Sequence, residues 1–422
     1  MNGVMPAIHG TQRIMARGWP KFSEITGAAA ALLLAVPFAS ATAATFGAAG
    51  LTYDGALLSQ FNLINLGNLN TATGSQIGGR VVVGGDYNTA GGSVACGVAS
   101  CAGNTTVAID TNGVVVNSSG NNGYGAVTVF GNIIGGLAVN HGDIDVKGSV
   151  SGNTYNLNGN GGLNLGGGSQ SSTVANAPTE IRTVSASPQG SVTNPTASVN
   201  GPNGVQTGDT MAKVFAPFAN ASTLASSFSN SLINLSRGIA ALPGTPGVSA
   251  QALPTSNATF FTAATDYTYN GYKYGVVTTT MANLAQQKSS FTGVANGASD
   301  TATFVIVTGD TGNLLPNLTY NDPKVIYDFV NATSLNFGNN SWTGSILAPL
   351  ATITQTSTSG TLNGSIVVAA FNQTKELLSS DIFTGDLSGL TGVQFSAVPE
   401  PASLLLLGVG AASTAWARRR RK

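Results

Sequence analysis

Two carboxylates on one predicted strand are the arrangement in this sequence that most resembles catalytic machinery. Asp143 and Asp145 flank Ile144, so on a β-strand both carboxylates would leave the same face. Glycoside hydrolysis uses such a pair of carboxyl groups around the scissile bond. Lys147 would share that face, however, and a solvated strand face with an ion pair explains the pattern better than catalysis does.

A nucleophilic triad finds equally little support. It would have to use His141, because the only other histidine lies in the first ten residues of the chain. The surrounding Asn140-His141-Gly142-Asp143 indicates a solvated turn. The sequence therefore predicts a protein that is not an enzyme and has no catalytic residues.

Candidate ligands for metals and phosphates are also isolated. Asp310 could give calcium an oxygen ligand, but the regular spacing of a calcium loop is missing and a turn is the simpler interpretation. Gly78-Gly79 and Gly84-Gly85 bracket a strand without a following Gly-Lys-Ser/Thr, so corners are expected there and not a phosphate cradle. We predict no cofactor and no bound metal.

Two further groups have spacings with structural meaning. Cys96 and Cys101 would close a small disulfide loop in an oxidising compartment, whereas zinc would require two more soft ligands. A threonine at every second position of one predicted strand would form a hydroxyl ridge that could face a sugar polymer or ice, or could simply reflect β-propensity. Its members are Thr352, Thr354, Thr356 and Thr358.

The C-terminus combines three features in a fixed order over residues 398–422. Pro399-Glu400-Pro401 breaks any helix, and sixteen apolar or small residues follow, close to the roughly 20 that span a bilayer. The chain then ends in cations that favour the cytoplasmic side, Arg418, Arg419, Arg420, Arg421 and Lys422. This order resembles the PEP-CTERM sorting signal of bacterial envelope proteins. The resemblance implies a short transmembrane segment, transient inner-membrane anchoring and removal of the tail by an exosortase.

The N-terminus predicts export as well. Arg13, Arg17 and Lys21 precede an apolar stretch over residues 27–39, and small residues up to Ala43 and Ala44 offer cleavage sites. Residues 1–44 are therefore expected to be a signal peptide read by the secretion machinery, although an uncleaved membrane anchor is the alternative. Most of the remaining charges are acidic, which argues against nucleic acid as a partner.

Residues 45–397 form the expected folded body. Strand-length runs with glycine and asparagine between them predict a mainly β fold, an irregular parallel β-solenoid (β-helix), with an antiparallel β-sandwich as the alternative. These runs include 80–85, 113–117, 127–131, 142–146 and 163–166, and later 272–277, 302–307, 325–329, 345–347 and 364–368.

Two segments interrupt the predicted strands. Residues 168–208 are rich in Ser, Thr, Asn, Pro and Gly, and we expect a surface loop or linker. Residues 209–238 carry an apolar stripe at helical spacing, which predicts one long helix packed alongside the solenoid. Pro217 conflicts with an unbroken helix, so a kink or a later start is expected; Gly238 is the expected stop, and residues 281–288 are a short helix.

Several blocks of the body resemble the choice-of-anchor A family of exported bacterial domains. They are residues 61–69, 77–86, 325–335, 342–349 and 362–367, including Gly344-Ser345-Ile346-Leu347-Ala348-Pro349. Asp328 stands where the family pattern predicts asparagine. The resemblance implies an adhesin-like β-solenoid with a helix along its flank, and no catalytic residues.

Together these features predict an exported, non-enzymatic protein of the cell surface or extracellular matrix. Its expected role is adhesion or biofilm structure through contacts with exopolysaccharide. The alternatives are a polysaccharide-active enzyme that uses Asp143 and Asp145, and a protein that binds ice or a crystalline surface through the threonine ridge.

Overall fold

The computed structural model is mainly β, as the sequence predicts, and its strands pair mostly in parallel. It describes residues 44–45, 54–55, 57–94, 107–109, 115–117, 125–151, 154–157, 162–167, 169–170, 173–175, 180–183, 205–206, 221–254, 261–287, 291–312, 315–320, 322–356 and 360–395. Within these residues the strands form three long parallel ladders, which we call the first, second and third ladder. The parallel pairing excludes the antiparallel sandwich for this part of the chain.

The chain visits the three ladders in turn. In one turn β5 (Val81–Val83) joins the first ladder, β6 (Tyr87–Thr89) the second and β7 (Gly92–Val94) the third. The next turn adds β10 (Val127–Val129), β11 (Ile133–Ile134) and β12 (Leu137–Val139) in the same register. Equivalent residues pair from turn to turn, as Val81, Val127 and Ile144 do in the first ladder. Each turn thus buries its apolar residues against its neighbours.

The first ladder is the longest. Its strands, in spatial order, are β21 (Gln251–Ala252), β24 (Tyr272–Thr280), β26 (Ala302–Thr308), β28 (Val325–Phe329), β31 (Ser345–Thr354), β33 (Ile366–Gln373), β2 (Leu63–Asn65), β5 (Val81–Val83), β10 (Val127–Val129), β13 (Ile144–Val146), β16 (Gly162–Leu165), β19 (Glu180–Thr183) and β20 (Val205–Gln206). A hairpin strand, β23 (Tyr267–Tyr269), pairs antiparallel with β24.

The second and third ladders run beside it. The second contains β27 (Thr311–Gly312), β29 (Ser334–Asn336), the later parts of β31 and β33, β3 (Leu69–Thr71), β6 (Tyr87–Thr89), β11 (Ile133–Ile134), β14 (Val150–Ser151) and β17 (Ser169–Gln170). The third contains β30 (Trp342–Thr343), β32 (Leu362–Asn363), β34 (Leu377–Leu378), β4 (Gln76–Ile77), β7 (Gly92–Val94), β12 (Leu137–Val139), β15 (Thr154–Leu157) and β18 (Thr173–Ala175).

Three short pairs complete the described strands. They are β1 (Ala44–Thr45) with β35 (Gln394–Phe395), β8 (Val107–Ile109) with β9 (Val115–Asn117), and β22 (Phe261–Thr262) with β25 (Val294–Ala295).

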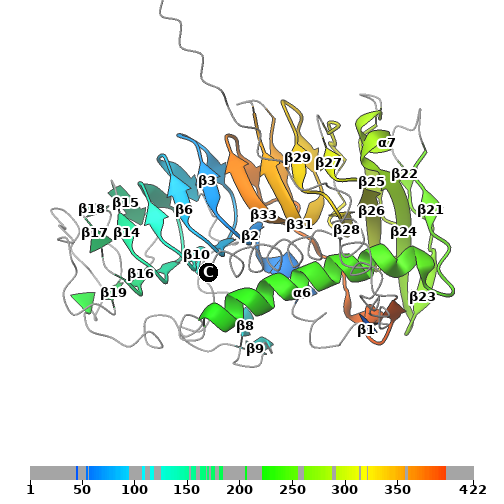
Figure 1. Cartoon of the computed structure of the whole chain (residues 1–422), viewed down its shortest axis with the longest axis horizontal. Helices are drawn as coiled ribbons and strands as arrows, with labels where there is room; N and C mark the ends of the chain where they lie inside the picture. Colours follow the sequence, from blue (N-terminus) through cyan, green and yellow to red (C-terminus); the bar gives the residue numbers. More distant parts are fainter. Residues whose placement is uncertain are drawn as a thin grey trace, which may run out of the picture. The chain divides into compact units, whose positions relative to one another are not determined.

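The order of the strands in space differs from their order in the chain. N-terminal strand β2 pairs with β33, so the ladders continue from the C-terminal half of the chain directly into the N-terminal half (Figure 1). At this seam the Asn62 side chain donates hydrogen bonds to the carbonyls of Gly364, 302 residues away, and of Leu378. Gln373 donates across the same seam to the carbonyl of Gln76.

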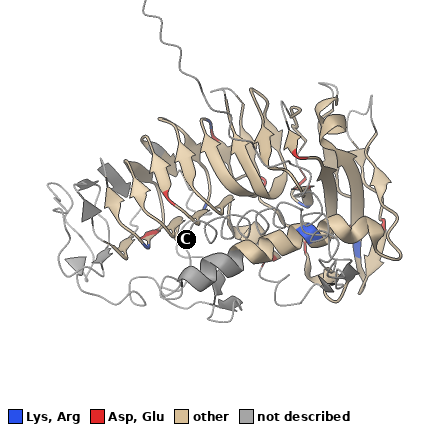
Figure 2. Ribbon diagram, in the orientation of Figure 1, with Lys and Arg blue, Asp and Glu red and all other residues tan. Residues whose placement is uncertain are grey.

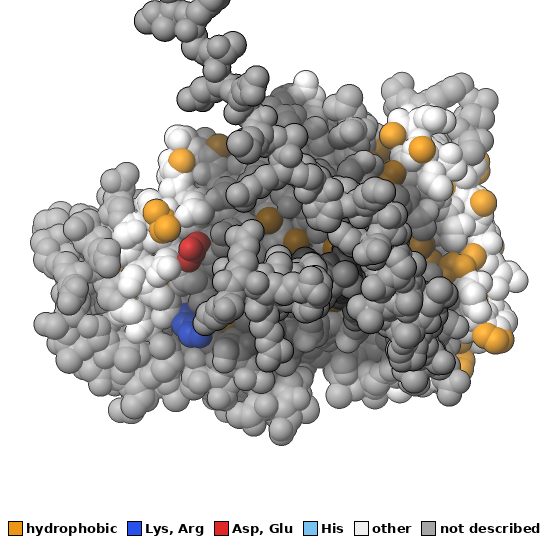
Figure 3. All heavy atoms as spheres, in the orientation of Figure 1, with side chains coloured by type: hydrophobic (Ala, Val, Ile, Leu, Met, Phe, Trp, Pro, Cys, Tyr) orange, Lys and Arg blue, Asp and Glu red, His pale blue; other side chains and the backbone are white. Residues whose placement is uncertain are grey.

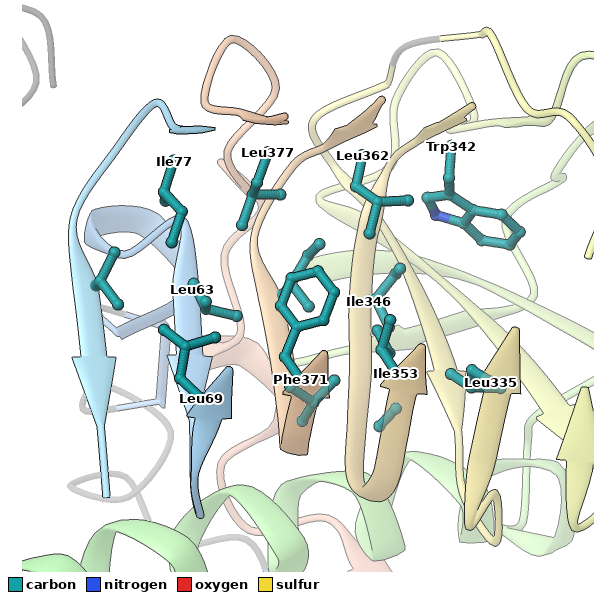
Figure 4. Close-up of a cluster of buried hydrophobic side chains, with 14 of the residues drawn as sticks. Leu63, Leu69, Ile77, Leu335, Trp342, Ile346, Ile353, Leu362, Phe371 and Leu377 are labelled. Carbon is teal, nitrogen blue, oxygen red and sulfur yellow. The ribbon is translucent and has the colours of Figure 1, made fainter. Parts of the chain in front are cut away.

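The core lies between the three ladders. Inward side chains such as Leu69, Phe371, Ile353 and Trp342 are fully buried and face one another across the interior (Figure 4). Most are branched aliphatic residues, which suit the pleated and crowded inner surface of short parallel strands.

A second apolar cluster covers the other side of the first ladder. Alternate residues of one strand divide between the clusters: Val305 and Val307 face the interior, while Phe304 and Ile306 join the outer cluster. The helix α6 (Ala221–Ala241) contributes Leu232, Leu235 and Ile239 and packs on β26, β28 and β31 (Figure 1). One-sided packing of this helix is therefore confirmed.

The helix boundaries differ from the prediction. The described helix begins at Ala221, beyond Pro217, and continues past Gly238 to Ala241. It ends where η2 (Leu242–Gly244) begins, because Pro243 cannot continue the helical hydrogen bonding. Residues 209–220 lie outside the described part of the chain. The short helix α7 (Met281–Ala285), the turn η3 (Ser388–Leu390) and the helical residues at 54–55 and 57–60 complete the helical elements among the described residues.

The predicted loop at residues 168–208 is also different. Residues 169–183 contribute β17, β18 and β19, and the register aligns Ile181 with Leu163 and Val205. A short strand needs only one or two apolar residues on its inward side. The polar composition of residues 168–208 therefore suggested a loop although the segment contains strands.

Candidate functional site

A column of glycines marks the corner between the first and second ladders. Gly67, Gly85, Gly131, Gly148 and Gly167 are linked in that order, each amide donating to the carbonyl of the preceding member at 2.7–3.0 Å. A Cβ atom on Gly131 would lie 2.6 Å from the carbonyl oxygen of Gly85. Only glycine lets the turns stack this closely, so the expected corner role of the Gly84-Gly85 pair is supported.

The residue after each of the first four glycines belongs to a polar column, which we call the corner column: Asn68, Asp86, Asn132 and Ser149. The side-chain oxygen of Asn68 accepts a hydrogen bond from the amide of Asp86 at 2.8 Å. Asp86 accepts from the amide of Asn132, and Asn132 accepts from the amide of Ser149. These side chains satisfy backbone donors at the corner while remaining at the surface.

Seven strands of the second ladder, from β29 to β14, each present an outward side chain, and on β3, β6, β11 and β14 this residue is the second after the corner-column residue. We call this row the ladder face: Asn336, Thr354, Asn372, Asn70, Asn88, Ile134 and Ser151, in register from β29 to β14. The amide of Asn70 donates to Asn372 at 2.9 Å and accepts from Asn88 at 2.8 Å. Their inward neighbours, Leu69 and Tyr87 among them, are buried.

The ladder face is broad and carries few charges. Seven strands at the usual spacing of about 4.8 Å cover roughly 30 Å. Asp86 is the one ionisable side chain in the ladder face and the corner column, and charged side chains are sparse over the described ribbon as a whole (Figure 2). The described surface visible in Figure 3 is mostly uncharged, with scattered apolar side chains. Ile134, 46% exposed, gives the ladder face one apolar contact point.

The predicted threonine ridge lies partly on this surface. Thr352 and Thr354 are half-buried and point outward, while Ala351, Ile353 and Gln355, which alternate with them, are buried. Thr354 joins the ladder face, and Thr352 pairs with Ser334 and Ala370 beside it. Thr356 is exposed, and Thr358 lies outside the described residues.

The carboxylate pair has a different setting from the one predicted. Asp145 is 1% exposed, so it does not lie on a solvated face. Its carboxylate accepts hydrogen bonds from the Gly125 amide at 3.0 Å and from the Asn164 side chain at 2.8 Å. Asp143 is half-buried and accepts from the Gly162 amide at 2.7 Å. Both carboxylates therefore join neighbouring turns.

Burial governs the protonation of this group. It raises the pKa of Asp145, the nearby charge of Asp143 raises it further, and hydrogen bonds from Asn164 and Gly125 oppose the change. Burial also lowers the pKa of Arg80, which the charge of Asp143 partly restores. A buried carboxyl with polar partners on the adjacent strands can stabilise a turn but offers little access to a substrate.

Two further acids are buried where α6 docks. Ser231 of α6 donates to Asp54 at 2.7 Å, and Ser236 donates to Asp328 at 2.6 Å. Burial raises the pKa of Asp54 to about 7 and that of Asp328 well above its ordinary value, and the serine hydrogen bonds oppose both changes. Asp328 thus sits at a helix–sheet contact where a neutral amide would also fit, consistent with the asparagine expected there.

The remaining isolated candidates lie in turns. His141 is in the bend between β12 and β13, and Gly142 beside it has a φ of 83°. Asp310 is exposed, and its carbonyl accepts a hydrogen bond from the Thr333 amide. No group of three or more potential metal ligands occurs among the described residues.

The row of amide side chains on the ladder face was not predicted, although a recurring four-residue pattern in the sequence indicates it. Glycine, a small polar residue, an apolar residue and an outward residue recur at 67–70, 85–88, 131–134 and 148–151. Their separations are 18, 46 and 17 residues. The long insertion at residues 95–124 obscures this repeat.

Other predicted residues lie outside the described part of the chain. These are Ala43, Cys96, Cys101 and all residues from 396 onward, including the sorting tripeptide and basic tail. Ala44 is described as part of β1. No helix within the described ranges is long and apolar enough to cross a membrane.

Comparisons with known proteins add two matches. The model of a family described as "Putative Ice-binding-like adhesive domain" matches residues 54–378, well over half of the chain. A PEP-CTERM protein-sorting motif matches residues 397–421. The choice-of-anchor A name is not among these matches and stays a prediction. No curated protein and no solved structure matches.

Proposed function

Because this chain belongs to the ice-binding-like adhesive domain family and ends in a PEP-CTERM sorting motif, it is an exported, adhesin-like surface protein, and we propose that its ligand is extracellular polysaccharide. The proposed binding surface is the ladder face with the adjoining corner column. The proposed setting is the cell surface or the biofilm matrix.

The observation that carries this proposal is the chemistry of the ladder face. Amide and hydroxyl groups recur in register from Asn336 to Ser151, and such groups exchange hydrogen bonds readily with sugar hydroxyls. Each contact is weak, but a repeating polymer meets many of them at once, so avidity can build affinity without a deep pocket.

The scarcity of charge also favours a neutral partner. Nucleic acids and anionic lipids bind proteins through clustered cations that release counterions. Neither the ladder face nor the corner column contains Lys or Arg. A polymer rich in hydroxyl groups fits this surface better.

We further propose that an exosortase-type enzyme processes the C-terminal signal after export. The expected intermediate is held in the inner membrane by the apolar stretch that follows Pro401, and the mature domain is then released or attached at the surface. Intact mass and fractionation of the native protein would test this step. A mature protein that keeps Arg418–Lys422 would contradict it.

The binding proposal is tested with purified mature protein and isolated matrix polysaccharide. Asn372→Tyr places a bulky ring in the centre of the ladder face and should weaken binding at least tenfold. Thr308→Tyr makes a similar change at an exposed position of β26, outside the ladder face, and should leave binding unchanged. Equal affinities for all three proteins, or no binding by any, would contradict the proposal.

Ice is a second candidate ligand, favoured by the regular spacing of Thr354 and its in-register neighbours. The same approach distinguishes it, because an ice-binding face should give thermal hysteresis that Thr354→Tyr abolishes. A wild-type protein without hysteresis would rule out this candidate.

We infer that the protein is not an enzyme. The supporting observation is that Asp145 is buried and that both candidate carboxylates bond to neighbouring turns. Turnover of a polysaccharide that Asp143→Asn or Asp145→Asn abolishes, in a variant that still melts like the wild type, would contradict this inference.

A further inference from the structure

Backbone amides fix the orientation of two asparagine side chains on the surface of the second ladder. The amide of Asp86 donates to Oδ1 of Asn68 at 2.8 Å, and the amide of Gly338 donates to Oδ1 of Asn336 at 2.9 Å. A backbone N–H can only donate, so the accepting atom is the side-chain oxygen and the other terminal atom is the NH2 group. Both side chains therefore keep their oxygen toward the backbone and leave their donors for other partners.

A row of side-chain hydrogen bonds orients the amides on the central strands. Asn88 donates to Asn70, and Asn70 donates to Asn372. The oxygen of Asn372 is thus occupied, and its NH2 group makes no hydrogen bond within the described residues, as is also true of Asn68 and Asn336. Among these five described amides only Asn88 keeps an oxygen that accepts no bond, so the surface offers more unused N–H donors than unused carbonyl oxygens.

Ala370 places a methyl group beside two of these donors. Leu69 pairs with Phe371, so Asn68 lies beside Ala370 on the neighbouring turn, about 4.8 Å away. Asn372 lies two residues further along β33 on the same face. Ala370 precedes buried Phe371 and is itself half-buried, so its methyl group points outward. A single methyl group is thus flanked by two side chains with unused NH2 groups.

The carboxylate of Asp86 restricts the kind of acceptor that this group of residues can bind. Asp86 follows Asn68 in the corner column, and its Oδ1 accepts from the backbone and side-chain amides of Asn132. A uronate, sulfate or phosphate group bound at Asn68 would meet this like charge at close range, and neither the corner column nor the ladder face has Lys or Arg to offset it. The favoured acceptor is therefore an uncharged carbonyl.

We propose that Asn68, Ala370 and Asn372 recognise the acetyl groups of a neutral polysaccharide, an inference that rests on the proposed function and narrows its ligand. The acetyl carbonyl accepts hydrogen bonds from the NH2 groups of Asn68 and Asn372, and the acetyl methyl group contacts Ala370. An unmodified sugar hydroxyl satisfies this site less well, because it brings no methyl group to Ala370. The rest of the ladder face supplies hydrogen bonds to the hydroxyl groups of the polymer.

Three neutral probes with the same sugar backbone test the proposal: a cellulose oligosaccharide, its O-acetyl ester, and a chitin oligosaccharide of equal length, each displayed densely on a surface. The exported protein should bind at least one acetylated probe about tenfold more tightly than the unmodified one. The tighter of the two acetylated probes shows whether the acetyl group is carried by an ester or by an amide.

The outcomes separate this proposal from the proposed function. Equal affinity for the three probes overturns acetyl recognition but leaves polysaccharide binding intact. A protein that binds matrix polysaccharide but none of the probes also overturns acetyl recognition alone. A protein that binds neither the probes nor matrix polysaccharide overturns both.

Two variants test the residues. Asn68→Asp keeps an acceptor for the Asp86 amide but removes both side-chain donors, and Ala370→Leu covers the methyl site. In each, the preference for the acetylated probe should fall from about tenfold to about twofold or less. All probes are neutral, so an added charge affects them alike; Thr308→Asp, outside the ladder face, is the charge control and should keep the preference. An unchanged preference in both variants, each melting like the wild type, overturns the assignment.

Discussion

At the scale of single residues, the glycine column shows how strictly backbone packing limits the sequence. Each member sits where a side chain would meet the carbonyl of the turn before it, as Gly148 does with Gly131. The polar residue that follows then accepts the next backbone amide. This division between a glycine that packs and a polar residue that bonds explains the recurring Gly-Asn, Gly-Asp and Gly-Ser pairs.

Gly131→Ala should destabilise the domain by about 1–3 kcal/mol, because the new methyl group would overlap the Gly85 carbonyl and the Asp86 carboxylate. Gly244→Ala is the matched control, since a Cβ atom added there would have no neighbouring atom within 4 Å. Thermal melts of both variants check the prediction. Equal melting temperatures would mean that the turns are not stacked as closely as described.

The glycine corners could be predicted from the sequence, but the side chains that contact one another across distant turns could not. The pairs Gly78-Gly79 and Gly84-Gly85 indicated turns because glycine clusters do so in general. The contact of Asn70 with Asn372 joins residues 302 apart, and no local pattern encodes which residues of distant turns share a register.

At the scale of elements, α6 is held by apolar packing and by two serine–aspartate hydrogen bonds. The stripe that includes Leu232 and Leu235 was readable from the sequence, so the helix and its buried side were predictable, whereas Ile239 lies beyond the expected stop at Gly238. The acids beneath it were not, because Asp54 and Asp328 belong to other segments and only the fold brings them to Ser231 and Ser236.

The raised pKa of Asp54 predicts a pH dependence of stability. The folded chain holds this proton up to about pH 7, whereas the unfolded chain releases it near pH 3.8. The contribution of Asp54 to folding stability should therefore be greatest below about pH 4 and fall as the pH rises to about 7, by roughly 4 kcal/mol over about 3 pH units.

Asp54→Asn should remove the contribution of Asp54 to the decline and raise stability at pH 8, because the amide keeps an acceptor for Ser231 without a buried charge. The buried acids Asp145 and Asp328 should still contribute to the decline in this variant. Exposed Asp310→Asn serves as the control and should follow the wild-type profile. Melting temperatures between pH 4 and pH 8 measure the effect. Parallel profiles for all three proteins would show that Asp54 is ionised without cost in the fold.

At the scale of the whole molecule, the distinguishing feature is the seam at which β33 meets β2. The strands themselves were largely predicted, including those at 127–129, 144–146 and 325–329. Their order was not, because each strand is apolar on its inner positions and could pair with several others. Tertiary contacts such as that from Asn62 to Gly364 select one order.

Asn62→Ala should destabilise both halves of the domain together, by about 1–3 kcal/mol, because two carbonyls at the seam lose their donor. Hydrogen exchange should then accelerate in residues 63–71 and in residues 362–378 alike. Asn331→Ala, in an exposed turn, is the control and should change neither segment. Faster exchange on one side alone would mean that the halves fold independently.

The polar ladder face is continuous because the seam joins strands from both halves, so the proposed adhesive surface belongs to the assembled molecule. Attachment of cells to a matrix-coated surface tests this most directly, in a deletion strain complemented with wild-type protein, Asn372→Tyr or Thr308→Tyr at equal surface levels. Wild-type protein and Thr308→Tyr should restore attachment, and Asn372→Tyr should not. Full attachment with Asn372→Tyr, or in the deletion strain itself, would contradict the account.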